Sequence, residues 1–321
     1  MSFDDVKSVW MGGELLPWRK ANIHVSSHAL HYGSGVFEGI RCYKTAHGPA
    51  VFRLTDHIDR LFASAHAYRM NIPYTRGELG AAVCQTIEAN AFESCYVRPI
   101  VFFGSATLSL NPRSCPVDAA VMAFPWPAML GEKAHEDGVR ITVSPWRKFS
   151  GDMMPTTAKA CGQYVNSILA VRDAADRGFD EALLLDAHGG VAEGAGENLF
   201  IVRDGVVRTN DDRHSILMGI TRDSVIRIAR DLGYRVETQP LSLEDLTLAD
   251  EAFFSGTAAE VTPIAEVDGA YVGNGRPGAV TRAIQGAFHA AVSGKSSRYA
   301  SWLHYVDECT FEGAYSAVPF I

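Results

Sequence analysis

Strongly basic stretches are missing from this sequence of 321 residues, and lysine itself is scarce. The chain has seven Lys against 22 Arg, and its formal net charge is −8. A protein whose main partner is nucleic acid usually carries a basic patch that neutralises phosphates. The charge pattern therefore argues against nucleic acid as the main partner.

Long apolar runs are missing as well. Residues 99–112 carry no charge but are too short and too polar to cross a bilayer, and Pro125 and Pro127 interrupt the next apolar run. The start, MSFDDVKSVW, is acidic and lacks the basic and then apolar pattern of a signal peptide. We therefore expect no association with a membrane.

Closely spaced cysteines are the third absence. The six Cys form no CxxC pair and no regular spacing; they are Cys42, Cys84, Cys95, Cys115, Cys161 and Cys309. The simplest interpretation is six reduced thiols in a cytoplasmic protein.

Short strand and helix patterns alternate along the whole chain, which predicts an α/β (α+β) fold. A length of 321 residues suffices for two domains with ample cores. The polar, glycine-containing segment 128–136 is the best candidate for an interdomain loop, so we expect one domain at 1–127 and another at 137–321. No internal repeat or low-complexity linker is present.

Several local patterns predict element boundaries. Thr75 and Glu78 have the spacing of a capping box before a helix, and the helix predicted at 164–177 should end at Gly178. Turns at 188–190 and 204–205 predict two β-hairpins. Thr221 is a good N-cap for a helix that follows it.

Three other motifs are given a structural interpretation. The GxGxxG at 273–278 lacks a following βαβ unit and an acid about 20 residues on, so it predicts a glycine-rich turn. His24, His28 and His31 have no accompanying carboxylate or Cys, which favours structural histidines over a metal site. The segment YGSGVFEG lacks the lysine of a phosphate loop, and a loop that faces substrate is an equally good interpretation.

One lysine is unusually isolated. Lys159 is the only charged residue from Met153 to Val171, within TTAKACGQY. An ammonium in small, apolar surroundings loses hydration, so its pKa falls and its amine becomes a nucleophile toward carbonyls. A lysine whose head reaches solvent at a helix start is the alternative, and this stretch alone does not decide between them.

Two further segments favour the chemical interpretation. Glu193 and Glu197 lie in VAEGAGENLF, where an acid could hold a proton on a ring nitrogen, although Glu197 suits a role in tying down the turn. The helix start at Thr221 offers backbone amides to a phosphate, and Thr257 in SGTAAEVTP adds another hydroxyl. A lysine, an acid and a phosphate cradle together describe a pyridoxal phosphate site.

Segments along nearly the whole chain resemble the class IV, fold-type IV aminotransferases, and most closely the branched-chain amino-acid aminotransferases. The segments that carry the resemblance are HALHYGSGVFEGIR, CYVRP, PTTAKACGQY, EGAGENLF, GITRDSVI and SGTAAEVTP. The resemblance implies a smaller N-terminal α/β domain and a larger C-terminal pseudo-barrel domain. It also implies a homo-oligomer, at least a dimer, and leaves a hexamer open.

The resemblance implies a role for each cofactor-binding residue in this sequence. Lys159 would form a Schiff base with pyridoxal 5′-phosphate and carry the proton, Glu193 would face the pyridine nitrogen, and Tyr164 would face the phenolic oxygen. The remaining residues would hold the phosphate: Arg60, Ile220, Thr221 and Thr257.

The resemblance likewise implies a substrate site. The α-carboxylate would meet Tyr96 and the amides of Thr257 and Ala258. Arg98, with Tyr32 from a neighbouring subunit, would bind the distal carboxylate of glutamate. The side-chain pocket would be lined by Phe37, Trp126 and Tyr164.

The implied activity is transamination between L-branched-chain amino acids (Leu, Ile, Val) and 2-oxoglutarate, which gives branched 2-oxo acids and L-glutamate. The alternatives on the same fold are an (R)-selective amine transaminase, a D-amino-acid transaminase and an aminodeoxychorismate lyase. A scaffold protein without catalysis is the alternative of another class. Gln163 and Met218 stand where Asn and Pro are common in the family, and the segment from Cys309 to the end has no recognised counterpart.

Overall fold

The computed structural model describes residues 3–126, 130–131, 133–211, 213 and 215–309. These residues divide into two compact units. The first unit contains 3–126 and 292–309, and the second lies within 130–291. The change of unit after Trp126 falls beside the predicted boundary at residue 127. Residues 128, 129 and 132 of the predicted interdomain loop lie outside the described residues, and Ala134–Asp137 form a short helix, α4, in the second unit.

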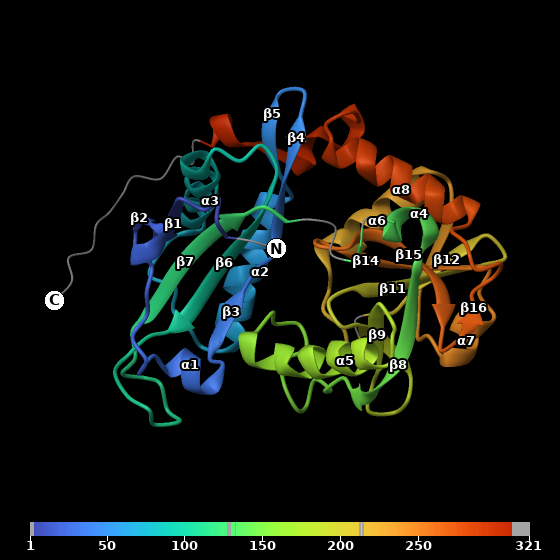
Figure 1. Ribbon diagram of the computed structural model, residues 1–321, viewed down its shortest axis with the longest axis horizontal. Helices are drawn as coiled ribbons and strands as arrows, with labels where there is room; N and C mark the ends of the chain where they lie inside the picture. Colours follow the sequence, from blue (N-terminus) through green and yellow to red (C-terminus); the bar gives the residue numbers. More distant parts are fainter. Residues whose placement is uncertain (1–2, 127–129, 132, 212, 214, 310–321) are drawn as a thin grey trace. The chain divides into compact units, whose positions relative to one another are not determined.

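The first unit is built on an antiparallel sheet (Figure 1). Within the described residues its strands run in the order β17-β5-β4-β6-β7-β1-β2, and β3 also pairs with β6. The strands are β1 (Ser8–Met11), β2 (Glu14–Pro17), β3 (Gly35–Phe37), β4 (Ile40–Thr45), β5 (Gly48–Phe52), β6 (Cys95–Phe103), β7 (Val117–Phe124) and β17 (Leu303–Tyr305). The helices are α1 (His28–Tyr32), α2 (Leu54–Ala67) and α3 (Arg76–Asn90), with 3₁₀ turns at Trp18–Lys20, Ser297–Trp302 and Val306–Glu308.

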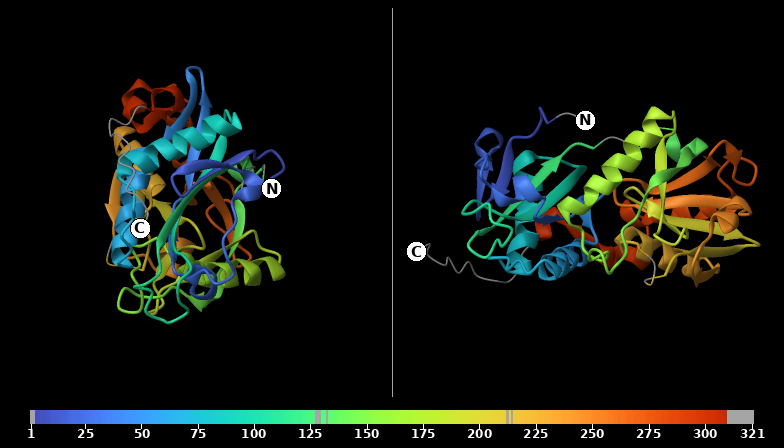
Figure 2. Two further views of the ribbon diagram at one scale, coloured as in Figure 1. Left: turned by 90° about the vertical axis from the view of Figure 1, so that its left-hand side faces the viewer. Right: turned by 90° about the horizontal axis from the view of Figure 1, so that it is seen from below.

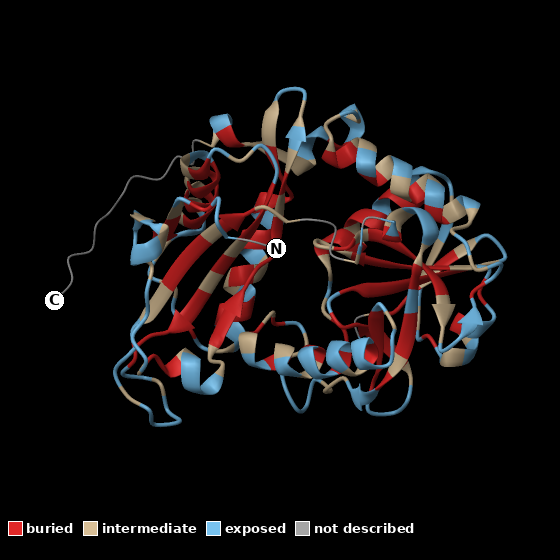
Figure 3. Cartoon of the chain, viewed as in Figure 1, coloured by how far each residue is buried: buried red, intermediate tan, exposed pale blue. Residues whose placement is uncertain are grey.

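Helices α2 and α3 pack on each other and on the sheet, as further views show (Figure 2). The predicted capping box is confirmed at the start of α3, where Thr75 and Glu78 each bond the other's backbone amide. Buried residues follow the strands and the inner helix faces, and exposed residues follow the outer faces (Figure 3). This is the pattern expected when each amphipathic element buries one face.

The C-terminal part of the chain returns to the first unit, which the sequence prediction did not foresee. Strand β17 pairs antiparallel with β5, with Leu303 opposite Phe52. The backbone pairing places residues 292–309 with the first unit instead of with the predicted domain 137–321. Residues 310–321, most of the segment without a recognised counterpart, lie outside the described residues.

The same return brings two cysteines together. Cys84 on α3 and Cys309 form a disulfide, with their Cα atoms 6.3 Å apart. The expectation of six reduced thiols is therefore wrong for this pair. The two cysteines are 225 residues apart in the sequence, so their spacing gives no sign that the fold brings them into contact. Cys42, Cys95 and Cys115 are buried thiols.

The second unit is built on a larger mixed sheet (Figure 1). Within the described residues its strands run in the order β10-β9-β8-β15-β14-β11-β12-β13, and β16 pairs with β15. The strands are β8 (Val139–Arg147), β9 (Glu181–Leu185), β10 (Val191–Gly194), β11 (Asn198–Arg203), β12 (Val206–Thr209), β13 (Arg235–Thr238), β14 (Glu251–Gly256), β15 (Glu260–Val267) and β16 (Ala270–Tyr271). The helices are α4 (Ala134–Asp137), α5 (Tyr164–Asp176), α6 (Ile220–Asp231), α7 (Leu243–Thr247) and α8 (Ala279–Val292), with a 3₁₀ turn at Cys161–Gln163.

Strand β9 is buried on both of its faces. Its sequence EALLL is a continuous apolar run after Glu181, and all five residues are buried. Leu183 and Leu185 belong to one core cluster, whereas Ala182 and Leu184 belong to another, which includes Ala170 of α5. Because successive side chains of a strand point to opposite faces, one face of β9 packs against α5. The other face packs into the core cluster that contains Leu183 and Leu185.

The other local predictions have mixed outcomes. Both hairpins are confirmed as the pairs β9–β10 and β11–β12, and the helix before Gly178 is confirmed as α5. Thr221 as N-cap is wrong: α6 begins at Ile220, and Gly219 is its N-cap, so Thr221 is the second helical residue. A residue already inside the helix cannot cap it, but its amide still lies in the first turn.

The predicted glycine-rich turn is confirmed. Gly273 and Gly275 have positive φ values in a turn after β16. The ring of His28 is hydrogen-bonded to the hydroxyl of Ser34 and the carbonyl of Ser109. Among the described residues, no group of three His, Cys, Asp or Glu could hold a metal ion. The described helices also include none long and apolar enough to span a membrane.

Candidate active site

Lys159 is positioned by the segment that leads into α5. It lies two residues before the 3₁₀ turn at Cys161–Gln163, and its neighbours Ala158 and Ala160 are buried. Its Nζ atom lies 2.5 Å from the hydroxyl of Tyr164, the first residue of α5, and 4.9 Å from the centre of that ring. The structure therefore brings together the predicted nucleophile and the residue predicted to contact the cofactor's phenolic oxygen.

Glu193, at the end of β10, is a buried carboxylate surrounded by donors. Its Oε1 lies 2.7 Å from Nζ of Lys148, and its Oε2 accepts hydrogen bonds from Nδ2 of Asn198 (3.2 Å) and the amide of Leu217 (2.9 Å). The side chains of Lys148 and Glu193 are 11% and 7% exposed. Three donors compensate the loss of hydration that burial imposes on the ionised form.

Lys148 and Asn198 were missed from the sequence. Nothing separates the segment PWRKF from an ordinary polar strand end, and Asn198 looked like the start of a strand. Asn198 also donates to the carbonyl of Leu217 at 2.8 Å, and a Cβ on Gly219 would overlap its side-chain oxygen. The side-chain amide of Asn198 therefore links the carboxylate of Glu193 to the backbone of the segment that leads into α6.

The start of α6 holds two of the residues predicted to bind the phosphate. Ile220 and Thr221 are 8% and 3% exposed, and they occupy the first turn of this helix of 12 residues. Amides in the first turn have no acceptor within the helix, and they carry the positive end of its dipole. The arrangement is suited to an anion such as a phosphate.

Pairing of β11 with β14 brings the remaining predicted residues of this unit into the same region (Figure 1). Asn198 lies opposite Ser255, so the turn at 257–259, which holds Thr257 and Ala258, follows directly beside the segment 194–197. A Cβ on Gly256 would lie 3.3 Å from the carbonyl of Gly196. The two turns therefore pack at the same edge of the sheet.

Glu197 differs from Glu193 although both are buried. Its Oε2 accepts a hydrogen bond from the amide of Gly196 at 3.1 Å, and its buried Oε1 has no hydrogen-bond partner among the described residues. Burial raises the pKa of Glu197 to about 7, the charge of Glu193 adds to the rise, and the Gly196 amide and Lys159 oppose it. Burial and the charge of Glu197 likewise raise the pKa of Glu181. The expected part of Glu197 in the turn is confirmed, but the sequence did not predict its raised pKa.

The first unit holds a separate set of predicted residues. Tyr96 and Arg98 are two residues apart on β6 and therefore point to the same face of the sheet. The guanidinium carbon of Arg98 lies 4.6 Å from the centre of the Phe37 ring and 5.3 Å from that of Tyr96. Trp126 stacks on Tyr96 with ring centres 4.6 Å apart. A Cβ at Gly39 would overlap the hydroxyl of Tyr96, so a larger residue there would displace the Tyr96 ring.

Two predicted residues of the first unit have other contacts. Arg60, on α2, forms a bidentate ion pair with Glu38 through Nε (2.6 Å) and Nη2 (2.9 Å). Tyr32, on α1, is 45% exposed, and its hydroxyl donates to the carbonyl of Leu108 at 2.8 Å. The predicted contacts of Arg60 with phosphate and of Tyr32 with a neighbouring site therefore stay predictions.

The two departures from the family pattern have different surroundings. Gln163 is buried, and its Nε2 donates to the carbonyl of Pro155 at 2.9 Å, so it closes the loop that carries Lys159. Met218 is 38% exposed beside Gly219 at the start of α6. Gln163 thus acts on the geometry of the lysine loop, and nothing in the structure explains the choice of Met218.

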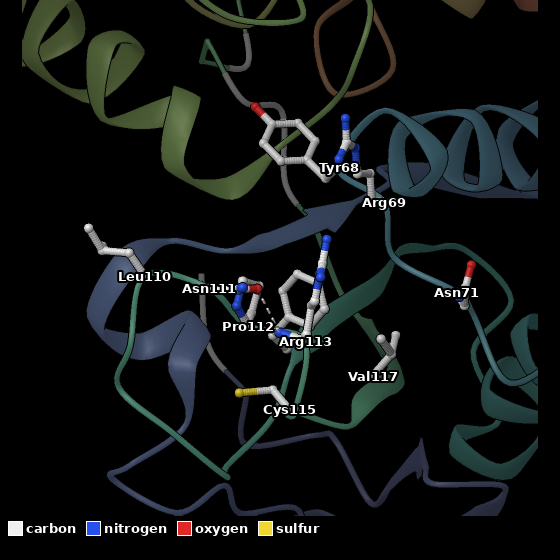
Figure 4. Close-up of a pocket in the computed structure, with 10 residues that line it drawn as sticks. Tyr68, Arg69, Asn71, Leu110, Asn111, Pro112, Arg113, Cys115 and Val117 are labelled. Atoms are coloured by element: carbon white, nitrogen blue, oxygen red, sulfur yellow. Dashed lines mark hydrogen bonds between the residues drawn. The ribbon is translucent and has the colours of Figure 1, made fainter.

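A cavity of about 560 Å³ in the first unit lies apart from the predicted residues, none of which lines it (Figure 4). Arg69, Asn71, Arg113 and Cys115 are among the residues that line it. Asn111 accepts a hydrogen bond from the amide of Arg113 at 3.3 Å. The cavity is thus not part of the candidate active site.

Comparison with known proteins identifies the family. Residues 35–267 match the family described as Amino-transferase class IV. The branched-chain-amino-acid aminotransferase of Pseudomonas aeruginosa is 45% identical over 294 residues, which are 92% of this chain and 95% of that protein. The solved Escherichia coli branched-chain amino acid aminotransferase is 45% identical, with a TM-score of 0.92 over 94% of this chain and 99% of that one.

A third relative has been solved with ligands. The T.th. branched-chain amino acid aminotransferase, 45% identical with a TM-score of 0.90, was complexed with N-(5′-phosphopyridoxyl)-L-glutamate and with 4-methylvaleric acid. These matches cover 94% of this chain and 99% of the solved chain.

The chain therefore belongs to the class IV aminotransferases, which use pyridoxal 5′-phosphate. Within that family it is a transaminase of the branched-chain amino-acid type, with the two-domain fold of that group. The relatives give no support to the alternative of a D-amino-acid transaminase. The second unit fits the cofactor chemically, because an amine, a hydroxyl, a buried carboxylate and a helix start lie among its described residues.

The raised pKa of Glu197 predicts a measurable pH dependence of stability. The ordinary pKa of a glutamate side chain is 4.5, and that of Glu197 in the folded protein is about 7. Between these two pH values the carboxyl of Glu197 keeps a proton in the folded protein that it releases in the unfolded chain. The stability contributed by this carboxyl is thus present below the unfolded pKa and is lost as the pH rises to the folded pKa. Glu197→Gln should therefore gain stability relative to the parent as the pH rises from 5 to 8, by at most roughly 3 kcal/mol.

Chemical denaturation of both proteins at several pH values measures this difference in the free energy of unfolding. Glu237→Gln is the matched control, because pairing with Arg208 lowers the pKa of Glu237 below its usual range. That variant should differ from the parent by a constant amount between pH 5 and pH 8. A constant difference for Glu197→Gln as well would refute the account of Glu197.

Proposed function

We propose that this chain transfers the amino group of L-leucine, L-isoleucine or L-valine to 2-oxoglutarate, with its predicted site residues in the roles given below. The observation that carries the proposal is the contact of Lys159 with Tyr164 in the unit that also holds Glu193 and the start of α6. The relative solved with a glutamate derivative and with a branched aliphatic acid supports the pair of substrates. A cytoplasmic location is part of the same proposal.

Lys159 is the proton carrier in this proposal. When bound, pyridoxal phosphate supplies a carbonyl that condenses with amines and a ring that takes up an electron pair. Nζ of Lys159 removes the proton from the α-carbon of the donor amino acid, and in the second half-reaction it delivers a proton to the α-carbon of the amino acid that is formed. The Tyr164 hydroxyl, 2.5 Å from Nζ, orients the amine. General-base catalysis of this kind is worth about 10²–10⁴-fold in rate.

Glu193 holds the ring nitrogen in its protonated form. Its carboxylate must be ionised for this role, and the donors Lys148, Asn198 and the Leu217 amide favour that charge. The phosphate is held by the start of α6 and by hydroxyls and a guanidinium, which we assign to Ile220, Thr221, Thr257 and Arg60. Glu193 and the phosphate residues together fix the cofactor at both ends.

Arg98 explains how one site accepts both an apolar and an acidic side chain. Its guanidinium lies over the rings of Phe37 and Tyr96, and its buried Nε has no hydrogen-bond partner among the described residues. A cation over aromatic faces is stabilised without a counter-ion, so it tolerates a neighbouring branched aliphatic chain. It can also pair with the distal carboxylate of glutamate. Tyr96, Thr257 and Ala258 would hold the α-carboxylate, and Trp126 and Tyr164 would complete the pocket.

A homo-oligomer, at least a dimer, is supported by an apolar patch in the first unit. Its members are large exposed side chains on and around α1 and the segment 108–110: Val25, Leu30, Tyr32, Leu108 and Leu110. The bond from the Tyr32 hydroxyl to Leu108 joins the two segments. Grouped exposed apolar side chains commonly mark protein interfaces. We propose that a second copy covers this patch and receives Tyr32.

The proposed specificity is tested by a steady-state panel of L-leucine, L-valine, D-alanine and (R)-1-phenylethylamine with 2-oxoglutarate. The two L-amino acids should have the highest kcat/KM, because the named residues fit an α-carboxylate and a branched chain. Faster turnover of the D-amino acid or of the amine would overturn the substrate assignment while leaving the family assignment intact.

Arg98→Ala should damage the two half-reactions unequally. Loss of a charge-assisted hydrogen bond should lower kcat/KM for 2-oxoglutarate by about 10–100-fold. The leucine half-reaction should fall far less, since its side chain needs no cation. Stopped-flow measurement of each half-reaction separates them, and Arg113→Ala, an exposed arginine, should change neither. Equal losses in both half-reactions of Arg98→Ala would contradict the assigned role.

The oligomer is tested by light scattering on the purified holoenzyme. The mass should be a multiple of the chain mass of 34.9 kDa. Leu110→Asp should shift the distribution toward the monomer, because it places a charge on an 81% exposed apolar side chain in the patch. A fully active parent monomer would contradict the proposed assembly.

A further inference from the structure

Glu38 carries a buried carboxylate that the sequence analysis did not single out. It lies between β3 and β4 and is 0% exposed. Its oxygens accept hydrogen bonds from Nε (2.6 Å) and Nη2 (2.9 Å) of Arg60 and from the amide of Gly39 (3.3 Å), and Nδ1 of His57 lies 2.7 Å away. Burying a carboxylate away from water costs free energy unless the charge is paired and hydrogen-bonded. The structure therefore keeps this buried charge at a cost that its partners must offset.

The charge of Glu38 is firmly established by its partners. Burial by itself would raise the pKa of this carboxyl. The charge of Arg60 and the hydrogen bonds from Arg60 and His57 outweigh burial and hold the pKa well below its usual range. The ionised form therefore persists throughout the neutral pH range.

The geometry of the pair fixes the orientation of Arg60. His57 and Arg60 are three residues apart on α2, so both side chains lie on one face of the helix and reach the same carboxylate. The two bonds to Glu38 use the Nε–Nη2 edge of the planar guanidinium. A bidentate pair sets the plane of the guanidinium as well as its position, and it directs the opposite edge away from Glu38.

We propose that Glu38, backed by His57, is a positioning residue that presents the guanidinium of Arg60 to the 5′-phosphate of the cofactor. The inference rests on the proposed function, in which Arg60 is a phosphate ligand. A guanidinium held in one plane loses less side-chain freedom when it binds an anion than a mobile one does. Glu38 thus acts through Arg60 and touches neither the phosphate nor the substrate.

A comparison of two ligands tests this role without reference to turnover. The dissociation constants of pyridoxal 5′-phosphate and of pyridoxal, which lacks the phosphate, are measured by absorbance titration of the full-length apoenzyme. Glu38→Gln should weaken pyridoxal phosphate binding by about 10–100-fold, the equivalent of one charge-assisted hydrogen bond. Pyridoxal binding should change by less than about threefold, because Arg60 has no phosphate to meet.

Asp56→Asn is the matched control. Asp56 forms the same kind of bidentate pair on the same helix, with Nε and Nη2 of Arg53 both at 2.7 Å, and Arg53 has no assigned role toward the cofactor. This variant should leave both dissociation constants unchanged. Should Glu38→Gln fail to fold in thermal melts, Glu38→Asp keeps the charge on a shorter arm, and the same selective loss is expected in smaller measure.

The outcomes separate the inference from the proposed function. Equal weakening of both ligands, or pyridoxal phosphate binding as tight as in the parent, would overturn the positioning role. If the parent itself binds pyridoxal phosphate no better than pyridoxal, the assignment of a phosphate site fails, and the inference fails with it. Failure of the parent to bind either ligand would refute the proposed function first.

Discussion

The arrangement of the second unit depends on supplying hydrogen-bond donors to the buried carboxylate of Glu193. Its three donors come from separate parts of the chain: Lys148 follows β8, Asn198 begins β11, and Leu217 precedes α6. Satisfying one carboxylate thus fixes three segments with respect to one another. The requirement extends to Gly219, where a side chain would overlap Asn198, and so to the start of α6. Glu193 and the segment that leads into α6 are therefore joined through Asn198 and Leu217.

The contrast between the two acids of EGAGEN shows how environment assigns roles. Glu193 has three donors, whereas Glu197 has one backbone amide and a buried oxygen without a partner among the described residues. The pKa of Glu197 is accordingly raised to about 7 by burial. A similar contrast holds in the first unit, where Glu38 is fully buried yet held ionised by Arg60 and His57. Partners, more than burial, decide the charge of these carboxyls.

Local chemistry could be predicted from the sequence, and long-range contacts could not. The capping box at Thr75 and the two hairpins follow from residues a few positions apart, and they were predicted correctly. The N-cap of α6 was misplaced because extended backbone at Gly219 begins the helix without a capping side chain. The pairing of β17 with β5 and the contact of Cys84 with Cys309 join distant segments, which no local pattern records. Lys148 and Glu38 were missed for the same reason.

The central claim is that Lys159 is the amine that holds pyridoxal phosphate. Borohydride reduction of the holoenzyme, followed by mass mapping of its peptides, tests this most directly because it fixes the cofactor to its lysine. The account predicts a single phosphopyridoxyl label on Lys159 and no label on Lys159→Ala. A label on Lys148, the other lysine among the candidate site residues of the second unit, or no label on the parent enzyme, would contradict it.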